Sequence, residues 1–67
     1  MKYYVNKNAQ PTGEHEIHIP GCKTFPEADN AKYLGDFYFY ESAKREANKY
    51  YLFVDACKNC LPLHHKK

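Results

Sequence analysis

The stretch Cys57-Lys58-Asn59-Cys60 places two thiols in one short segment, and a second such segment, His18-Ile19-Pro20-Gly21-Cys22, lies far upstream. Together they read as H-x3-C, a gap of thirty-four residues, and C-x2-C. Structural zinc sites take four ligands from thiolate sulfur and imidazole nitrogen, and ligands close in sequence reach one ion from a single turn. The spacing therefore predicts one Zn2+ ion bound by four residues: His18, Cys22, Cys57 and Cys60.

The short length of the chain favours a structural metal ion. Its 67 residues are enough for one domain, and a domain of this size buries only about 60% of the surface that its unfolded chain exposes. Such small domains commonly add a metal, a disulfide or a partner subunit, and zinc contributes on the order of 10 kcal/mol to their folding. We expect residues 1–63 to form a single zinc-binding domain, followed by a flexible tail at 64–67.

Charge and hydropathy exclude several classes of protein. The net charge is only +2, from ten Lys and Arg against eight Asp and Glu, which does not favour a polyanion-binding surface. No apolar run reaches the 18 residues of a spanning helix, and Met1–Asn6 lacks the apolar segment of a signal peptide. We expect a cytoplasmic protein without a membrane partner, because a reducing compartment keeps the three cysteines free for a metal.

Two segments show the period of a β-strand. Lys2–Asn6 and Glu14–Ile19 are predicted to form short strands that pair antiparallel. In the second strand the alternation places His18 opposite Ile17 and Ile19, so its imidazole turns away from the hydrophobic face toward a metal. The Pro-Gly turn that follows would bring the next cysteine back beside the end of the strand.

A third short strand is predicted over Tyr33–Phe37, with Gly35 marking a β-bulge or a close backbone approach. Tyr40–Tyr51 shows the period of an amphipathic helix. Its apolar stripe consists of Tyr40, Ala43, Ala47, Tyr50 and Tyr51. Asp36 is the nearest candidate for an N-terminal cap. The pattern predicts an α+β fold, with a small antiparallel sheet of two to three short strands, one main helix and a zinc-knuckle site.

Other interpretations of the cysteines stay open. Cys57 and Cys60 could be a redox dithiol, although that motif normally opens a helix within a βαβ unit, and here it follows the predicted helix. The three cysteines could also be unrelated buried thiols. His64 or His65 could replace His18 as the fourth ligand, because Cys60 and His64 have the same x3 spacing.

The order of these features resembles the Ada-type metal-binding domain and its small bacterial relatives: a strand leading into H-x3-C, an aromatic-rich strand, a helix with A-x3-A and a closing C-x2-C. The resemblance covers about Tyr3 to Leu61 and implies a small sheet with a helix around one zinc ion. The Ada domain accepts a methyl group from DNA on the first cysteine of its C-x3-C pair. Here that position is His18, and an imidazole is not the thiolate nucleophile that this chemistry needs.

The predicted function is a small non-enzymatic zinc-binding module with a structural site, whose partner is an unidentified protein or nucleic acid. Four protein ligands leave no open coordination position for catalysis. We expect a monomer or a weak dimer. The alternative is a nucleic-acid-binding module that uses exposed tyrosines beside a basic face. That face would consist of Lys44, Arg45, Lys49, Lys58 and the Lys66-Lys67 tail.

Overall fold

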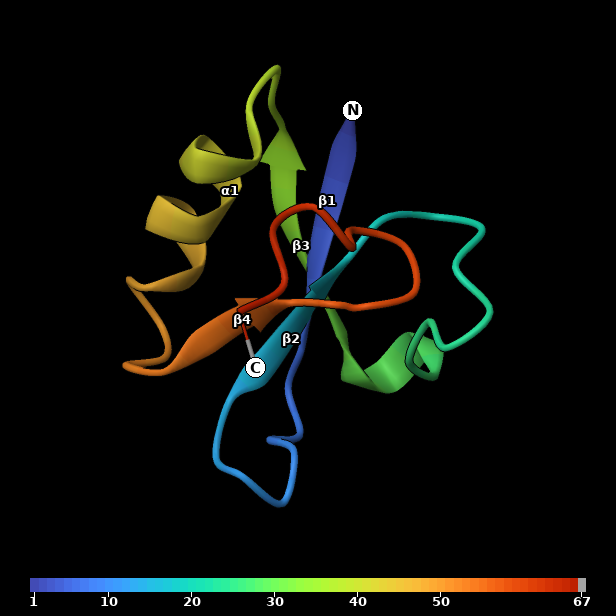
Figure 1. Cartoon of the computed structure of the whole chain (residues 1–67), viewed down its shortest axis with the longest axis vertical. Helices are drawn as coiled ribbons and strands as arrows, with labels where there is room; N and C mark the ends of the chain where they lie inside the picture. The colour runs from blue at the N-terminus through green and yellow to red at the C-terminus, as the bar shows by residue number, and fades with distance from the viewer. Residues whose placement is uncertain (67) are drawn as a thin grey trace.

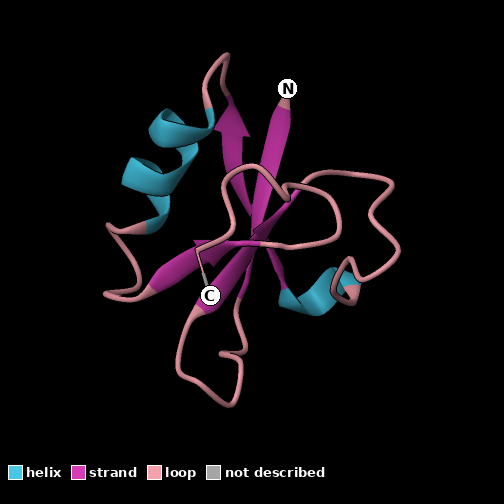
Figure 2. Cartoon of the chain, in the orientation of Figure 1, coloured by secondary structure: helices cyan, strands magenta, loops and turns pink. Residues whose placement is uncertain are grey.

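The computed structural model describes residues 1–66, and their elements follow one another as shown in Figure 1. They are β1 (Lys2–Asn6), β2 (His15–His18), the 3-10 helix η1 (Ala28–Asn30), β3 (Ala31–Asp36), α1 (Tyr40–Ala47) and β4 (Val54–Ala56). Figure 2 shows α1 and η1 on opposite sides of the crossing strands. The α+β class expected from the sequence is confirmed.

The sheet differs from the expected one in strand number and direction. Over residues 1–66 it has four strands in the order β3-β1-β2-β4. β1 runs antiparallel to β2 and β3, but β4 runs parallel to β2. The prediction of a purely antiparallel sheet of two to three strands is therefore wrong. β4 was missed because three residues, Val54–Ala56, are too few to show a period.

The parallel pairing of β2 and β4 brings the histidine and cysteine residues that lie at or just after the ends of these strands to the same edge of the sheet. The register sets His15 beside Val54 and Ile17 beside Ala56. Parallel strands end at the same edge of a sheet, and they require a long crossover connection, which here runs through η1, β3 and α1. As a result, the turn after β2 and the segment after β4 leave the sheet side by side.

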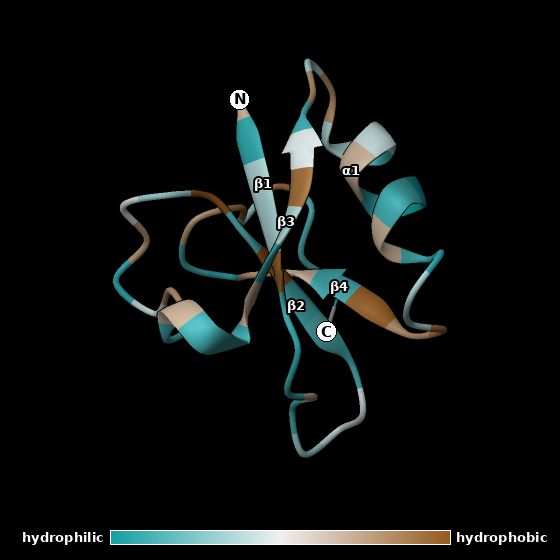
Figure 3. Ribbon diagram, turned by 180° about the vertical axis from the view of Figure 1, so that it is seen from behind, coloured by the Kyte–Doolittle hydropathy of each residue, from teal (hydrophilic) through white to brown (hydrophobic). Residues whose placement is uncertain are grey.

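The hydrophobic core lies between α1 and one face of the sheet. In Figure 3 the hydrophobic residues of β3 and β4 appear brown on the strands next to α1. The buried residues of this core are Tyr3, Val5, Ile17, Leu34, Tyr40, Ala43, Ala47, Ala56 and Leu61. The two alanines of α1 are fully buried, and their small side chains let the helix lie close to the strands.

The helix is shorter than its apolar period predicts. It ends at Ala47, whose carbonyl accepts turn hydrogen bonds from the backbone N–H groups of Tyr50 and Tyr51. Of the predicted apolar stripe, Tyr50 is half exposed, whereas Tyr51 packs against the core from the turn after the helix. The N-cap position is Phe39, without a side-chain capping bond, and Asp36 belongs to β3 instead. Within residues 1–66 the helices are too short and polar to cross a membrane.

The predicted irregularity at Gly35 is confirmed. The register between β1 and β3 shifts from Tyr3 opposite Gly35 to Tyr4 opposite Tyr33, which leaves Leu34 as the extra residue of a bulge. Gly35 has a φ of 140°, a conformation that L side chains rarely adopt. The bulge lets the buried Leu34 point into the core.

Residues 64–66, part of the predicted tail, lie against the domain. The His64 ring stacks on Tyr40 with 4.4 Å between centroids. His65 Nδ1 lies 2.8 Å from the carbonyl oxygen of Ala56, and the backbone N–H of Lys66 donates to the Asp55 carboxylate. The last residue of that tail, Lys67, lies outside the described residues. Tail flexibility itself stays a prediction.

Candidate metal centre

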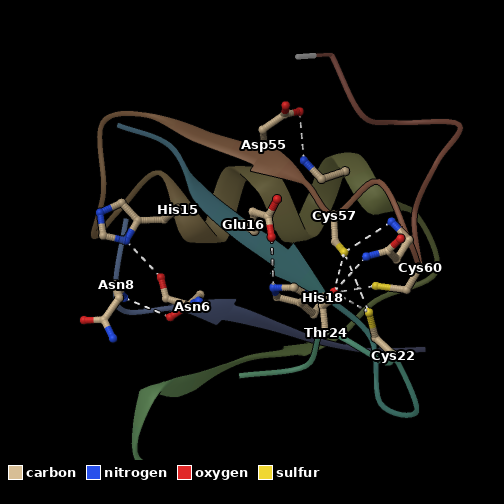
Figure 4. A network of polar contacts seen from close by, with 12 residues as sticks. Asn6, Asn8, His15, Glu16, His18, Cys22, Thr24, Asp55, Cys57 and Cys60 are labelled. Atoms are coloured by element: carbon tan, nitrogen blue, oxygen red, sulfur yellow. Dashed lines mark hydrogen bonds and ion pairs between the residues drawn. The ribbon is translucent and has the colours of Figure 1, made fainter. Parts of the chain in front are cut away.

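The structure brings together all four residues that the sequence spacing selected. One ligand atom from each of His18, Cys22, Cys57 and Cys60 lies within 4.8 Å of every other. Cys22 Sγ and Cys57 Sγ are 3.7 Å apart, and Cys60 Sγ lies 4.0 Å from His18 Nδ1. Figure 4 shows the three sulfur atoms gathered on one side of the His18 ring.

These separations fit a single tetrahedral ion. Zn–S bonds of about 2.3 Å and Zn–N bonds of about 2.0–2.1 Å, at tetrahedral angles, place two sulfurs about 3.8 Å apart and a sulfur about 3.6 Å from a nitrogen. The observed 3.7 Å between Cys22 and Cys57 matches the first value, and the 4.0 Å from Cys60 to His18 is close to the second. A disulfide would require about 2.05 Å, and the three cysteines are free thiols. The donor set therefore suits a metal ion.

The first pair of ligands is positioned by the end of β2 and the turn after it. His18 is the last residue of β2 and is buried. Gly21 has a φ of 89°, which a residue with a side chain would adopt only under strain. The turn closes with a hydrogen bond from the Cys22 backbone N–H to the Ile19 carbonyl at 3.3 Å. Cys22 is thereby folded back beside His18, as the Pro-Gly pattern predicted.

The second pair of ligands follows β4 directly. The Cys57 backbone N–H donates to the Ile17 carbonyl at 2.9 Å, which extends the β2–β4 pairing into the site. The Leu61 N–H donates to the Cys57 carbonyl at 2.8 Å and closes a turn around Cys60. Within that turn the Asn59 N–H points at Cys57 Sγ from 3.4 Å. This arrangement is the predicted knuckle.

Two polar residues beside the sulfurs were not identified from the sequence. The Thr24 hydroxyl oxygen lies 3.3 Å from both Cys22 Sγ and Cys57 Sγ. The Asn59 side-chain amide donates to the same oxygen at 3.1 Å. Because that oxygen already accepts from Asn59, its own proton is free to point at a sulfur. The only sequence signal was proximity, since Asn59 stands between two ligands and Thr24 follows Cys22 by two positions.

Burial and hydrogen bonding set the protonation of the donors. Burial raises the pKa of Cys60 to about 12. Burial also acts to raise the pKa of Cys22, but hydrogen bonds, first among them that of the Thr24 side chain, outweigh it and lower this pKa. Burial lowers the pKa of His18, so its imidazole is neutral at neutral pH and offers a lone pair. A cation at the centre of the cluster would favour the thiolate forms.

The other three histidines lie outside this cluster. His15 Nδ1 is 2.9 Å from the Asn6 carbonyl oxygen, and its ring stacks on Tyr51. His64 and His65 lie against Tyr40 and β4 as described above. Among residues 1–66, His18 is therefore the histidine that joins the three cysteines, and the alternative with a tail histidine receives no support from the geometry.

Comparison with known protein families, curated proteins and solved structures finds no match for this chain. The resemblance to the Ada-type domain thus rests on the order of strands, helix and ligand pairs alone and stays a prediction.

Proposed function

We propose that the protein is a small non-enzymatic module that binds one Zn2+ ion at a structural site. The observation that carries the proposal is the convergence of three thiols and one imidazole from segments thirty-five positions apart, within 4.8 Å of one another. Each donor comes from a position that the backbone fixes, either at a strand end or in a hydrogen-bonded turn.

The donor types favour zinc. Thiolate and imidazole are the ligands of structural zinc sites, where the Cys3His set is common and the geometry is tetrahedral. Calcium and magnesium prefer oxygen ligands, and no carboxylate belongs to the cluster within the described chain. Iron–sulfur clusters and copper also bind cysteine, and elemental analysis distinguishes these metals from zinc.

A structural role follows from where the ion would lie. It would join the turn after β2 to the segment after β4, in a molecule whose core holds only nine buried apolar residues in the part that the structure describes. Zinc adds on the order of 10 kcal/mol to such domains. Four protein donors complete a tetrahedral shell, which leaves no position for a substrate or a reactive water.

Charge supports this proposal over a nucleic-acid interface. Lys49 forms an ion pair with Glu46 at 3.0 Å. Lys58 lines a pocket together with Glu16 and Asp55. Two members of the predicted basic face therefore have acidic neighbours, which weakens attraction for phosphates. The proposed partner is accordingly an unidentified protein, and the proposed compartment is the reducing cytoplasm, where thiols remain available to zinc.

Metal content and one pair of variants test this function. Protein purified without chelator should contain one zinc per chain, measured by elemental analysis. His18→Ala should lower zinc affinity by at least about tenfold, because it removes one of four ligands. His15→Ala is the matched control, since His15 lies on the same strand outside the cluster, and it should keep full zinc content.

Folded protein that contains no metal and shows three freely titrating thiols would refute the proposal. So would equal zinc affinities of His18→Ala and His15→Ala, measured by competition with a chromophoric chelator. A different metal at one equivalent, such as iron, would retain the site but change its chemistry, and would overturn the assignment to zinc.

A further inference from the structure

A carboxylate lies behind the histidine of the metal centre. Glu16 precedes His18 by two positions on β2, so the period of the strand puts both side chains on the same face. Glu16 Oε1 is 3.6 Å from His18 Nε2. Figure 4 shows Glu16 on the opposite side of the imidazole from the three sulfur atoms.

The two ring nitrogens of His18 face different surroundings. Nδ1 faces the cluster, 4.0 Å from Cys60 Sγ. Nε2 is buried, and within the described residues it has no hydrogen-bond partner. A neutral imidazole carries its proton on one nitrogen and its lone pair on the other. A buried N–H strongly favours an acceptor, and the acceptor on the Nε2 side is the Glu16 carboxylate.

We propose that Glu16 is the positioning residue of the metal centre, an inference that rests on the proposed function. Its carboxylate accepts the Nε2–H of His18, which holds the imidazole in the tautomer whose Nδ1 lone pair faces the metal. Metal-bound histidines commonly donate their second N–H to a carboxylate in this way. The present separation exceeds a hydrogen bond by about half an ångström, so the proposal includes a shift of the Glu16 side chain toward the ring when zinc is bound.

Glu16 is held close to His18 by its surroundings. Its side chain is 20% exposed and lines a pocket together with Asp55 and Lys58. The strand fixes its backbone, because the neighbouring residues Ile17 and Ala56 are paired across β2 and β4. A carboxylate on a backbone held in this way can orient the histidine without being a ligand itself.

Variants at Glu16 test the inference through zinc affinity, measured by competition with a chromophoric chelator. Glu16→Ala should weaken binding about 10- to 100-fold, the range seen when such carboxylates are removed. Glu16→Gln keeps an acceptor oxygen and should recover part of that loss. Glu27→Ala removes an equal charge from an exposed side chain that makes no capping bond, and its affinity should stay within about twofold of the original.

Nitrogen-15 NMR of the unaltered zinc-loaded protein gives a second readout that does not depend on variants folding. His18 should show a protonated Nε2 and a metal-bound Nδ1. Zinc bound through Nε2 would overturn the role of Glu16 while leaving the zinc module intact, as would equal affinities of Glu16→Ala and Glu27→Ala. A chain that binds no zinc at all would overturn both proposals.

Discussion

At the scale of single residues, the Thr24 hydroxyl is placed to lower the nucleophilicity of two cysteine sulfurs. It lies 3.3 Å from Cys22 Sγ and from Cys57 Sγ, and Asn59 donates to its oxygen. A hydrogen bond to a charged acceptor contributes about 1.5–3 kcal/mol. Donation to a zinc-bound thiolate would withdraw charge from sulfur and make it a poorer nucleophile.

Thr24→Val removes that donor while keeping the shape of the side chain. We expect the zinc-loaded variant to be alkylated by iodoacetamide roughly tenfold faster, as followed by mass spectrometry, because about 1.4 kcal/mol corresponds to a factor of ten. Thr12→Val, on the loop before β2, serves as the control and should react at the original rate. Equal rates for both variants would show that Thr24 does not protect the sulfurs.

The convergence of His18, Cys22, Cys57 and Cys60 could be predicted from the sequence because each pair lies within one turn, and local spacing carries that information. Thr24 and Glu16 could not. The contact of Thr24 with Cys57 forms only when the loop after β2 and the segment after β4 come together. Glu16 shares a strand face with His18, but the strand period alone does not give the side of the imidazole that its carboxylate approaches. A residue that only contacts a candidate metal ligand belongs to no Cys/His motif, so motif spacing does not identify it.

At the scale of elements, α1 carries an ionisable ring in the core. Tyr40 is 6% exposed. Burial, followed by the charges of Asp55 and Glu41 and by Tyr3, raises its pKa from 10.0 to about 12. The unfolded chain therefore ionises first as pH rises. The contribution of the neutral phenol is complete below about pH 10 and is lost between about pH 10 and 12.

Tyr40→Phe should remove this alkaline sensitivity. We expect the variant to retain up to about 3 kcal/mol of unfolding free energy that the original protein loses between pH 10 and 12. Urea denaturation of the zinc-loaded proteins at several pH values measures the difference. Tyr38→Phe changes a ring that is 89% exposed and should follow the original protein. An unchanged alkaline loss in Tyr40→Phe would place its origin elsewhere.

The elements long enough to show a repeating apolar pattern were predicted from the sequence. The two three-residue elements, η1 and β4, were not. β1, β2 and the start of α1 follow their apolar patterns, because each buries one face against the core. The helix ends at Ala47, and in the turn that follows, Tyr50 is half exposed, with Lys32 Nζ 4.1 Å from its ring centroid. β4 is a strand because it pairs with the edge of β2, and no local sequence pattern predicts which segment will pair there.

At the scale of the whole molecule, the proposed zinc ion would supply much of the stability that so small a core lacks. We expect removal of zinc by a strong chelator to abolish the far-ultraviolet circular dichroism of the folded state, because the ion contributes on the order of 10 kcal/mol and domains of this size have little stability in reserve. Adding zinc back should restore the spectrum. A metal-free chain that keeps a cooperative thermal transition would contradict this expectation.

The parallel pairing of β2 with β4 also bears on how fast the protein can acquire its metal. The Cys57 N–H bonds to Ile17 across forty positions of chain, and such a distant contact forms slowly, after its loop-closure entropy has been overcome. An ion that first binds His18 and Cys22 would have only two of its four ligands until β4 pairs with β2 and brings Cys57 and Cys60 into place. We therefore expect the rate of zinc capture at saturating zinc to equal the rate of chain closure, independent of how much more zinc is supplied.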